Sequence, residues 1–99
     1  MKIQINTDNS IRGSEQMQAY FASSIDNSLH HFSPYVTRIE VYLSDLNGQD
    51  KRCLLEARVR RRQPVAVSDS GSTINQAVNG ATEKLKALLN TIVQRRRNC

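Results

Sequence analysis

Cysteine is rare in this sequence, with only Cys53 and Cys99 among the 99 residues. Two cysteines are too few for a disulfide-based scaffold and too few for a four-ligand metal site. No apolar run approaches the length of a membrane span, and the first ten residues lack the apolar core of a secretory signal peptide. We therefore expect reduced thiols, no membrane segment and a cytoplasmic location.

Aromatic side chains are also scarce: tryptophan is absent, and there are three tyrosines and two phenylalanines. Tyr20 falls on an apolar stripe and is expected in the core. Tyr42 is expected on the outward face of a strand, where it can stack on a base, while Tyr35 beside Pro34 fits either role. So few aromatics argue against a stacking platform for single-stranded RNA and favour binding through phosphates and RNA shape.

No constellation of catalytic groups is visible in the sequence. The carboxylates are scattered without a pair suited to general acid–base work, and no serine has the local signature of a nucleophile. His30 and His31 are adjacent, so on a helix they point about 100° apart, and we interpret them as surface residues rather than metal ligands. Residues 68–72 lack the spacing and lysine of a phosphate-binding loop. We expect no enzyme activity, cofactor, metal or small-molecule substrate.

Positive charge is concentrated in the second half of the chain. Residues 1–50 hold three basic and six acidic residues, whereas residues 51–99 hold eleven basic and three acidic ones. Ten of the basic residues are arginines, whose planar guanidinium suits bidentate contact with phosphate. The clusters at residues 58–62 and 95–97 favour nucleic-acid binding. The competing interpretation is a solvated face that keeps the protein soluble.

Hydrophobic periodicity predicts six elements. Alternation indicates strands at residues 2–6, 37–43, 51–61 and 64–68, with Cys53 a small buried hydrophobe in the third. Spacings of three and four predict a helix capped by Ser14 and ending at Pro34, and a second helix over 74–97 capped by Thr73 with Gln76, or by Ser72. Residues 68–72 are expected to form a loop.

The predicted order β-α-β-β-β-α indicates one α+β domain spanning residues 1–99. Because each strand has one apolar face and each helix one apolar stripe, the economical packing is a two-layer sandwich, a four-stranded sheet with both helices on one face. The other face of the sheet is then open to solvent and carries arginine. If the first two strands are parallel neighbours, the helix between them makes a right-handed crossover.

Several segments carry a family resemblance: KIQIN at the start, LHHF at the end of the first predicted helix, the strand TRIEVYL, and AVNGATEKLKALL in the second helix. In this order they resemble the bacterial hibernation-promoting factor and ribosome-associated translation inhibitor family, also called sigma-54 modulation proteins. The resemblance implies a factor that occupies the small ribosomal subunit between head and body, blocks the messenger and transfer-RNA sites, and silences ribosomes under stress. Lys84 and, more loosely, Lys86 match the family's ribosomal-RNA contacts.

Some positions depart from the family pattern. Ser23, Ser24, Asn27 and Ser28 stand in the half of the first helix where relatives usually carry lysines. Thr73 and Asn75 stand where relatives carry an acidic residue and a tyrosine near the start of the second helix.

We therefore predict a non-enzymatic ribosome-binding regulator whose partner is the small ribosomal subunit and its ribosomal RNA, with the oligomeric state left open. The alternative is a protein-interaction module, or a general RNA-binding domain with a basic surface. The candidate RNA-binding residues combine the helix cations with the strand arginines, which we expect to form a second basic surface. They are Lys84, Lys86, Arg95, Arg96, Arg97, Arg58, Arg60, Arg61 and Arg62.

Overall fold

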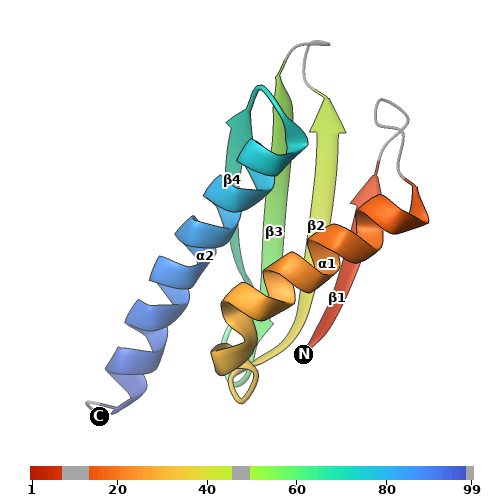
Figure 1. The fold of residues 1–99 in the computed structure, drawn as a ribbon. Helices are drawn as coiled ribbons and strands as arrows, with labels where there is room; N and C mark the ends of the chain where they lie inside the picture. Colours follow the sequence, from red (N-terminus) through yellow and green to blue (C-terminus); the bar gives the residue numbers. More distant parts are fainter. Residues whose placement is uncertain (8–13, 46–49, 98–99) are drawn as a thin grey trace.

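Four strands and two helices follow one another in the predicted order β-α-β-β-β-α (Figure 1). The structure is a computed structural model that describes residues 1–7, 14–45 and 50–97. The turn residues of the segment 45–48 (Asp-Leu-Asn-Gly) predict a hairpin connection, but this segment lies largely outside the described residues, as does Cys99. The elements are β1 (Lys2–Thr7), α1 (Glu15–Leu29) with a following 3-10 turn, η1 (His30–Phe32), β2 (Val36–Asp45), β3 (Lys51–Val59), β4 (Val65–Gly71) and α2 (Ile74–Arg97).

The strands form one mixed sheet in the order β1-β2-β3-β4. β1 runs parallel to β2, with Ile3 opposite Ile39, whereas β2–β3 and β3–β4 are antiparallel. A parallel pair needs a crossover connection, which α1 provides. Both helices cover the same face, α1 toward β1 and α2 across β3 and β4 (Figure 1). The predicted α+β architecture with a four-stranded sheet is therefore confirmed.

The core lies between the sheet and the two helices. Alternate residues of the central strands point into it, so that Ile39, Val41 and Leu55 have no exposed surface. α1 contributes one row of side chains at spacings of four, and α2 a longer row at spacings of three and four. The buried helix residues are Phe21, Ile25, Leu29, Ala77, Val78, Ala81, Thr82, Leu85, Leu89, Ile92 and Val93.

Both helices begin with side-chain caps. The Ser14 hydroxyl accepts a hydrogen bond from the Met17 amide at 3.0 Å, as the sequence predicts. At the start of α2 the Thr73 hydroxyl accepts from the Gln76 amide at 3.1 Å, while the Gln76 side-chain oxygen accepts from the Ser72 amide at 3.0 Å. Gln76 thus bonds back to the preceding chain, and both candidate capping residues take part.

Two predicted boundaries between strands and loops are wrong. Residues 68–71 belong to β4 rather than to a loop, because Ser68 and Ser70 pair with Leu54 and Arg52 across the sheet. Pairing with a neighbouring strand outweighs the low strand propensity of serine and glycine. β3 ends at Val59 instead of residue 61, since Arg61 has a positive φ of 66° that turns the chain out of the sheet.

The prediction that Tyr20 lies in the core is also wrong. Its side chain is 60% exposed, because the buried row of α1 runs through its neighbour Phe21 to Ile25 and Leu29. Tyr20 therefore lies one residue off that row, and its ring meets the Phe21 ring edge-on with centroids 5.2 Å apart. Tyr42 is 42% exposed on the open face, as predicted.

Cys53 is fully buried as a free thiol, which confirms its interpretation as a small core residue. Burial disfavours the thiolate, and the negative charge of Asp69 on β4 adds to the effect. Together they raise the pKa of Cys53 from 9.0 to about 12.

This shift predicts a loss of stability at alkaline pH. The unfolded chain loses the Cys53 proton above pH 9.0, whereas the folded chain keeps it until about pH 12, so the free energy of unfolding falls as pH rises through this window. The slope approaches at most about 1.4 kcal/mol per pH unit. Urea denaturation between pH 8 and pH 11 measures it. The slope becomes shallower in C53A when both proteins carry C99S; equal slopes in the two proteins would contradict the assignment.

Candidate nucleic-acid interface

The two arginine clusters of the sequence meet at one end of the molecule. The turn after β3 carries one of them and the last turn of α2 carries the other. The Arg96 guanidinium donates a hydrogen bond to the carbonyl oxygen of Arg60, which ties the helix end to the turn. We call this surface the arginine end. It comprises Arg60, Arg61, Arg62, Arg95, Arg96 and Arg97.

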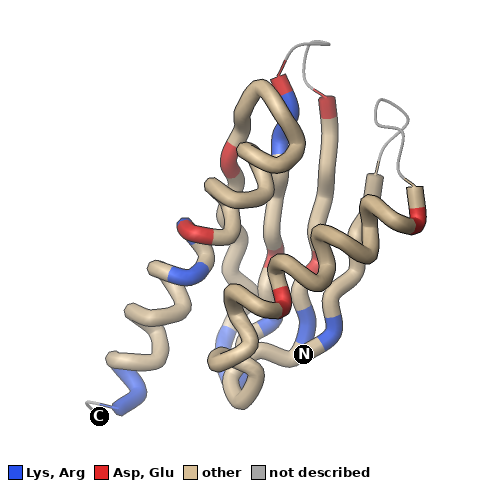
Figure 2. The backbone as a smooth tube through the Cα atoms, in the orientation of Figure 1, with Lys and Arg blue, Asp and Glu red and all other residues tan. Residues whose placement is uncertain are grey.

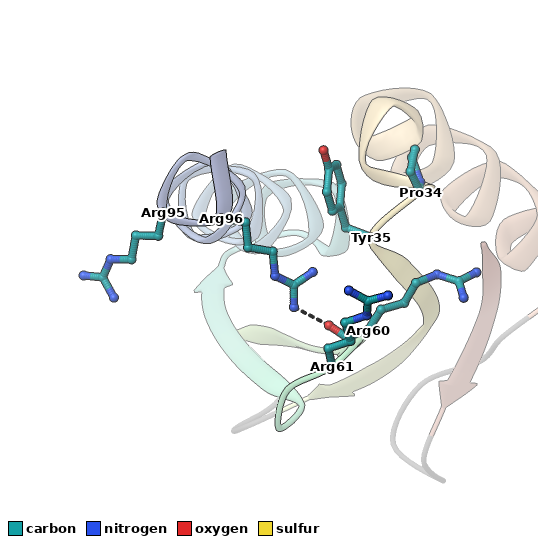
Figure 3. A pocket seen from close by; sticks show the side chains of 6 residues that line it. All are labelled: Pro34, Tyr35, Arg60, Arg61, Arg95 and Arg96. Carbon is teal, nitrogen blue, oxygen red and sulfur yellow. Dashed lines mark hydrogen bonds between the residues drawn. The ribbon is translucent and has the colours of Figure 1, made fainter. Parts of the chain in front are cut away.

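A cavity of about 610 Å³ opens at the arginine end (Figure 3). Its lining comes from the start of β2, the β3–β4 turn and the end of α2: Pro34, Tyr35, Arg60, Arg61, Arg95 and Arg96. A second hollow of about 400 Å³ adjoins it, with Arg61, Arg95 and Arg96 lining both. From the sequence we expect the strand arginines to form a second basic surface. This expectation is wrong for Arg60, Arg61 and Arg62, which line cavities together with Arg95 and Arg96 of the helix end.

Main-chain contacts fix the turn that presents these side chains. The Arg60 amide donates to the Tyr35 carbonyl at 2.8 Å, just beyond the pairing of Val36 with Val59. The next residue, Arg61, has the left-handed backbone that glycine adopts without strain. An arginine in this conformation costs on the order of 1 kcal/mol, and such strain often accompanies functional sites.

Within residues 1–7, 14–45 and 50–97, no carboxylate forms an ion pair with the arginine end. Among the described residues, the ion pairs of Lys and Arg with carboxylates are Arg38–Glu40, Lys51–Asp45 and Lys84–Asp69, none of which includes an arginine of this surface. Figure 2 shows acidic segments near the opposite end of the sheet, where β2 ends at Asp45. Clustered guanidiniums without acidic partners repel one another and favour a bound polyanion.

A row of cations on the open face of the sheet adds to this end. The register places Lys2, Arg38 and Arg58 side by side across β1, β2 and β3. Arg58 is exposed as predicted, whereas Lys2 and Arg38 are absent from the sequence-based candidates. Both alternate outward in their strands, but only the strand register forms the row: Arg38 pairs with Arg58 across β2 and β3, and with Lys2 across β1 and β2.

Glu40 partly balances this row. Its carboxylate accepts hydrogen bonds from the Asn6 amide at 2.9 Å and from Arg38. These two bonds lower the pKa of Glu40, with a smaller contribution from the charge of Arg58. Arg38 is therefore engaged within the sheet, while Lys2 and Arg58 have no ion pair to a described carboxylate.

The two candidate lysines lie elsewhere, midway along α2. Lys84 precedes Arg95 by eleven positions, about 16 Å along the helix. Its ammonium donates to the Ser68 carbonyl at 3.0 Å and lies 3.5 Å from the Asp69 carboxylate. Lys86 is half-buried and points about 200° around the helix from Lys84. The structure therefore does not bring the lysines together with the arginines.

Gly80 allows the Asp69 carboxylate to lie against α2. A Cβ atom at this position would fall 1.8 Å from an oxygen of that carboxylate, so any other residue would require the Asp69 side chain to move. The close approach holds Asp69 where it meets Lys84, which reduces the positive charge that Lys84 offers to an external anion.

No metal-binding group of three or more His, Cys, Asp or Glu side chains occurs within residues 1–7, 14–45 and 50–97. His30 and His31 are both exposed in η1, and the nearest carboxylate oxygen of Asp26 is 3.9 Å from His30 Nδ1. In the part of the chain that the structure describes, no helix is long and apolar enough to span a bilayer.

A mixed four-stranded sheet with two helices on one face and arginines at one end defines a small basic α+β domain. The chain belongs to the sigma-54 modulation protein / S30EA ribosomal protein family, whose model matches residues 3–97. This confirms the resemblance that the sequence motifs indicate. No curated protein matches the sequence.

Solved structures share the fold at low sequence identity. A ribosomal subunit interface protein from Coxiella burnetii superposes with a TM-score of 0.74 at 14% identity, over 95% of this chain and 99% of that one. The N-terminal domain of Thermus thermophilus Protein Y gives a TM-score of 0.69 at 18% identity, over 92% of this chain and 94% of that one. At these identities the likeness shows the fold alone.

The strained backbone at Arg61 predicts that glycine stabilises the protein there. R61G removes the steric cost of the left-handed conformation, about 1–2 kcal/mol, and adds freedom to the unfolded chain, so it should raise the free energy of unfolding by up to about 1 kcal/mol in chemical denaturation. The matched control is R62G, at a neighbouring position without a positive φ. There glycine only adds freedom to the unfolded chain and should lower the stability by up to about 1 kcal/mol. Stabilisation by both variants, or by neither, would count against strain at Arg61.

Proposed function

We propose that this protein is a non-enzymatic regulator that binds the small ribosomal subunit and inhibits translation, or promotes ribosome hibernation, under stress. The observation that carries the proposal is the arginine end, where cations from the β3–β4 turn and from α2 converge without acidic partners among the described residues. Membership of the family and the structural likeness to a ribosomal subunit interface protein support a ribosomal partner. Such a partner places the protein in the cytoplasm.

Ribosomal RNA is the component that the arginine end suits best. Guanidinium groups bind phosphate oxygens in a bidentate manner, and the backbone of folded RNA offers phosphates at close spacing. Each neutralised phosphate releases counterions, so the affinity falls with salt and the slope reports the number of contacts. Arg58 and Lys2 on the open sheet face extend the same surface.

The lysines of α2 take a secondary part in this proposal. The Lys84 ammonium already bonds the Ser68 carbonyl and lies beside the Asp69 carboxylate, whose negative charge opposes a phosphate at the same place. This pairing reduces the net contribution of Lys84 compared with an arginine that has no acidic partner among the described residues. The family resemblance singles out Lys84, whereas the charge balance of this chain favours the arginine end.

The open face of the sheet supports a second candidate, a protein-interaction module. Exposed Tyr42 lies opposite Leu54 in the β2–β3 register, which gives a small apolar patch away from the arginine end. Aromatic residues on such patches are frequent at interfaces with proteins. Pull-downs with and without nuclease separate the two functions, because RNA-mediated partners are lost on digestion and direct protein partners remain.

Co-sedimentation with small ribosomal subunits tests the proposed function. The double variant R62Q/R97Q removes two positive charges from the arginine end. Its matched control, K84Q/K86Q, removes two positive charges from the middle of α2. We expect the arginine pair to weaken binding more, and to reduce the salt slope by about 0.7–0.9 per lost phosphate contact. Binding that is unchanged from low to high salt, or a larger loss in the lysine pair, would contradict this assignment.

A translation assay provides the functional measurement. Added wild-type protein should lower the yield of a cell-free translation reaction, and R62Q/R97Q should require a higher concentration for the same inhibition. If the wild-type protein binds small subunits and leaves translation unchanged, the inhibitory part of the proposal is wrong.

A further inference from the structure

The cavity at the arginine end combines two kinds of wall. Pro34 and Tyr35 form an apolar side, and guanidinium-bearing residues of the turn and of α2 form the other (Figure 3). In Figure 3 the ring of Tyr35 stands between Pro34 and Arg96, with its hydroxyl directed away from the arginines of the turn. A surface that binds only phosphates needs neither an aromatic ring nor a cavity.

The cavity matches a small ligand in size and in chemistry. Its volume of about 610 Å³ lies within the usual range of about 300–1,000 Å³ for small-molecule sites. None of the described residues that line it carries a carboxylate, so all the charged side chains among them are positive and suit an anionic group. An aromatic face beside guanidiniums suits a planar ring attached to a phosphate, which is the chemistry of a nucleotide.

The walls are held in place before a ligand binds. Tyr35 packs against the core, and its carbonyl accepts the hydrogen bond from the Arg60 amide. Arg96 uses one nitrogen to bond the Arg60 carbonyl. A guanidinium has five N–H donors, so Arg96 retains others for a phosphate. Arg61 is placed here by the left-handed backbone of the turn.

We propose that this cavity binds one unpaired nucleotide, with its base stacked on Tyr35 and its phosphate on the guanidinium groups of Arg61 and Arg96. The nucleotide belongs to an RNA strand, and in this respect the inference deepens the proposed function and rests on it. A free nucleoside monophosphate presents the same base and phosphate, so the experiment separates the two sources. A single stacked base is consistent with a protein that has too few aromatics for an extended stacking platform.

Arg95 offers a matched control. It is one of the residues that line the cavity, but Figure 3 shows its guanidinium directed away from Arg60 and Arg61. R95Q and R96Q therefore remove the same charge from adjacent positions, and only R96Q removes a guanidinium that points toward the turn. Y35L retains an apolar side chain without a ring, and Y35F retains the ring without the hydroxyl.

Fluorescence anisotropy with two labelled probes tests the proposal. One probe is a short single-stranded RNA of mixed sequence, and the other is the same sugar–phosphate strand without bases. Stacking of one base should make the wild-type protein bind the first probe about 5- to 150-fold more tightly. Y35L should lose this preference, Y35F should keep it, and R96Q should weaken the binding of both probes more than R95Q does.

Competition with unlabelled nucleoside monophosphates identifies the source. If they displace the RNA probe only at concentrations far above the dissociation constant of the strand, the ligand is a nucleotide within RNA. Displacement at concentrations near that constant would overturn the RNA assignment in favour of a free nucleotide.

Equal binding of the two probes by the wild-type protein, or a preference that survives in Y35L, would overturn the proposal. Thermal unfolding checks that Y35L is folded. Should it not fold, photo-crosslinking of a 4-thiouridine strand to the wild-type protein replaces it, with the crosslink expected at Tyr35 and not at Tyr42. Wild-type protein that co-sediments with small subunits but shows no base preference would refute this inference alone. Wild-type protein that shows the base preference but does not co-sediment with small subunits would refute the proposed function alone.

Discussion

The contact between the end of α2 and the β3–β4 turn determines how positive charge is distributed on this protein. The Arg96 guanidinium bonds the Arg60 carbonyl, and residues 60–62 thereby lie beside residues 95–97 although more than thirty positions separate them. The length of α2 makes this possible, because its buried row continues to Ile92 and Val93 and carries the last turn to the end of the sheet. Without that packing, the sequence would present two small basic patches.

Concentrating like charges at one end opposes folding, and the chain offsets that effect in identifiable ways. The helix dipole favours cations in the last turn of α2. The Arg96 guanidinium also donates a hydrogen bond to the Arg60 carbonyl, a neutral acceptor that stabilises the guanidinium and leaves its positive charge in place. The open sheet face instead balances Arg38 with Glu40. At Arg61 the backbone strain is not offset by a local bond to a described residue, which is the pattern expected where a side chain is retained for binding.

Charge pairing also distinguishes cations that look alike in the sequence. Lys84 matches a family contact, yet Asp69 and the Ser68 carbonyl engage its ammonium. Gly80 makes this arrangement possible because it leaves room for the Asp69 carboxylate against the helix. A lysine already paired with a carboxylate gains less from a phosphate than an arginine that has no acidic partner among the described residues.

The sequence by itself determined the order of elements, the faces that are buried and the family, because periodicity and segment motifs are local properties that each element retains on folding. The sequence analysis placed Tyr20 in the core wrongly, because a shift of one position along a helix rotates a side chain by about 100°. It also extended β3 too far, because the single left-handed residue Arg61 ends the strand. The cavity beside Tyr35, the row Lys2–Arg38–Arg58 and the pairing of Lys84 were decided only by the tertiary structure. Each depends on strand register or on helix length, which bring together residues whose separation in the sequence carries no sign of their contact.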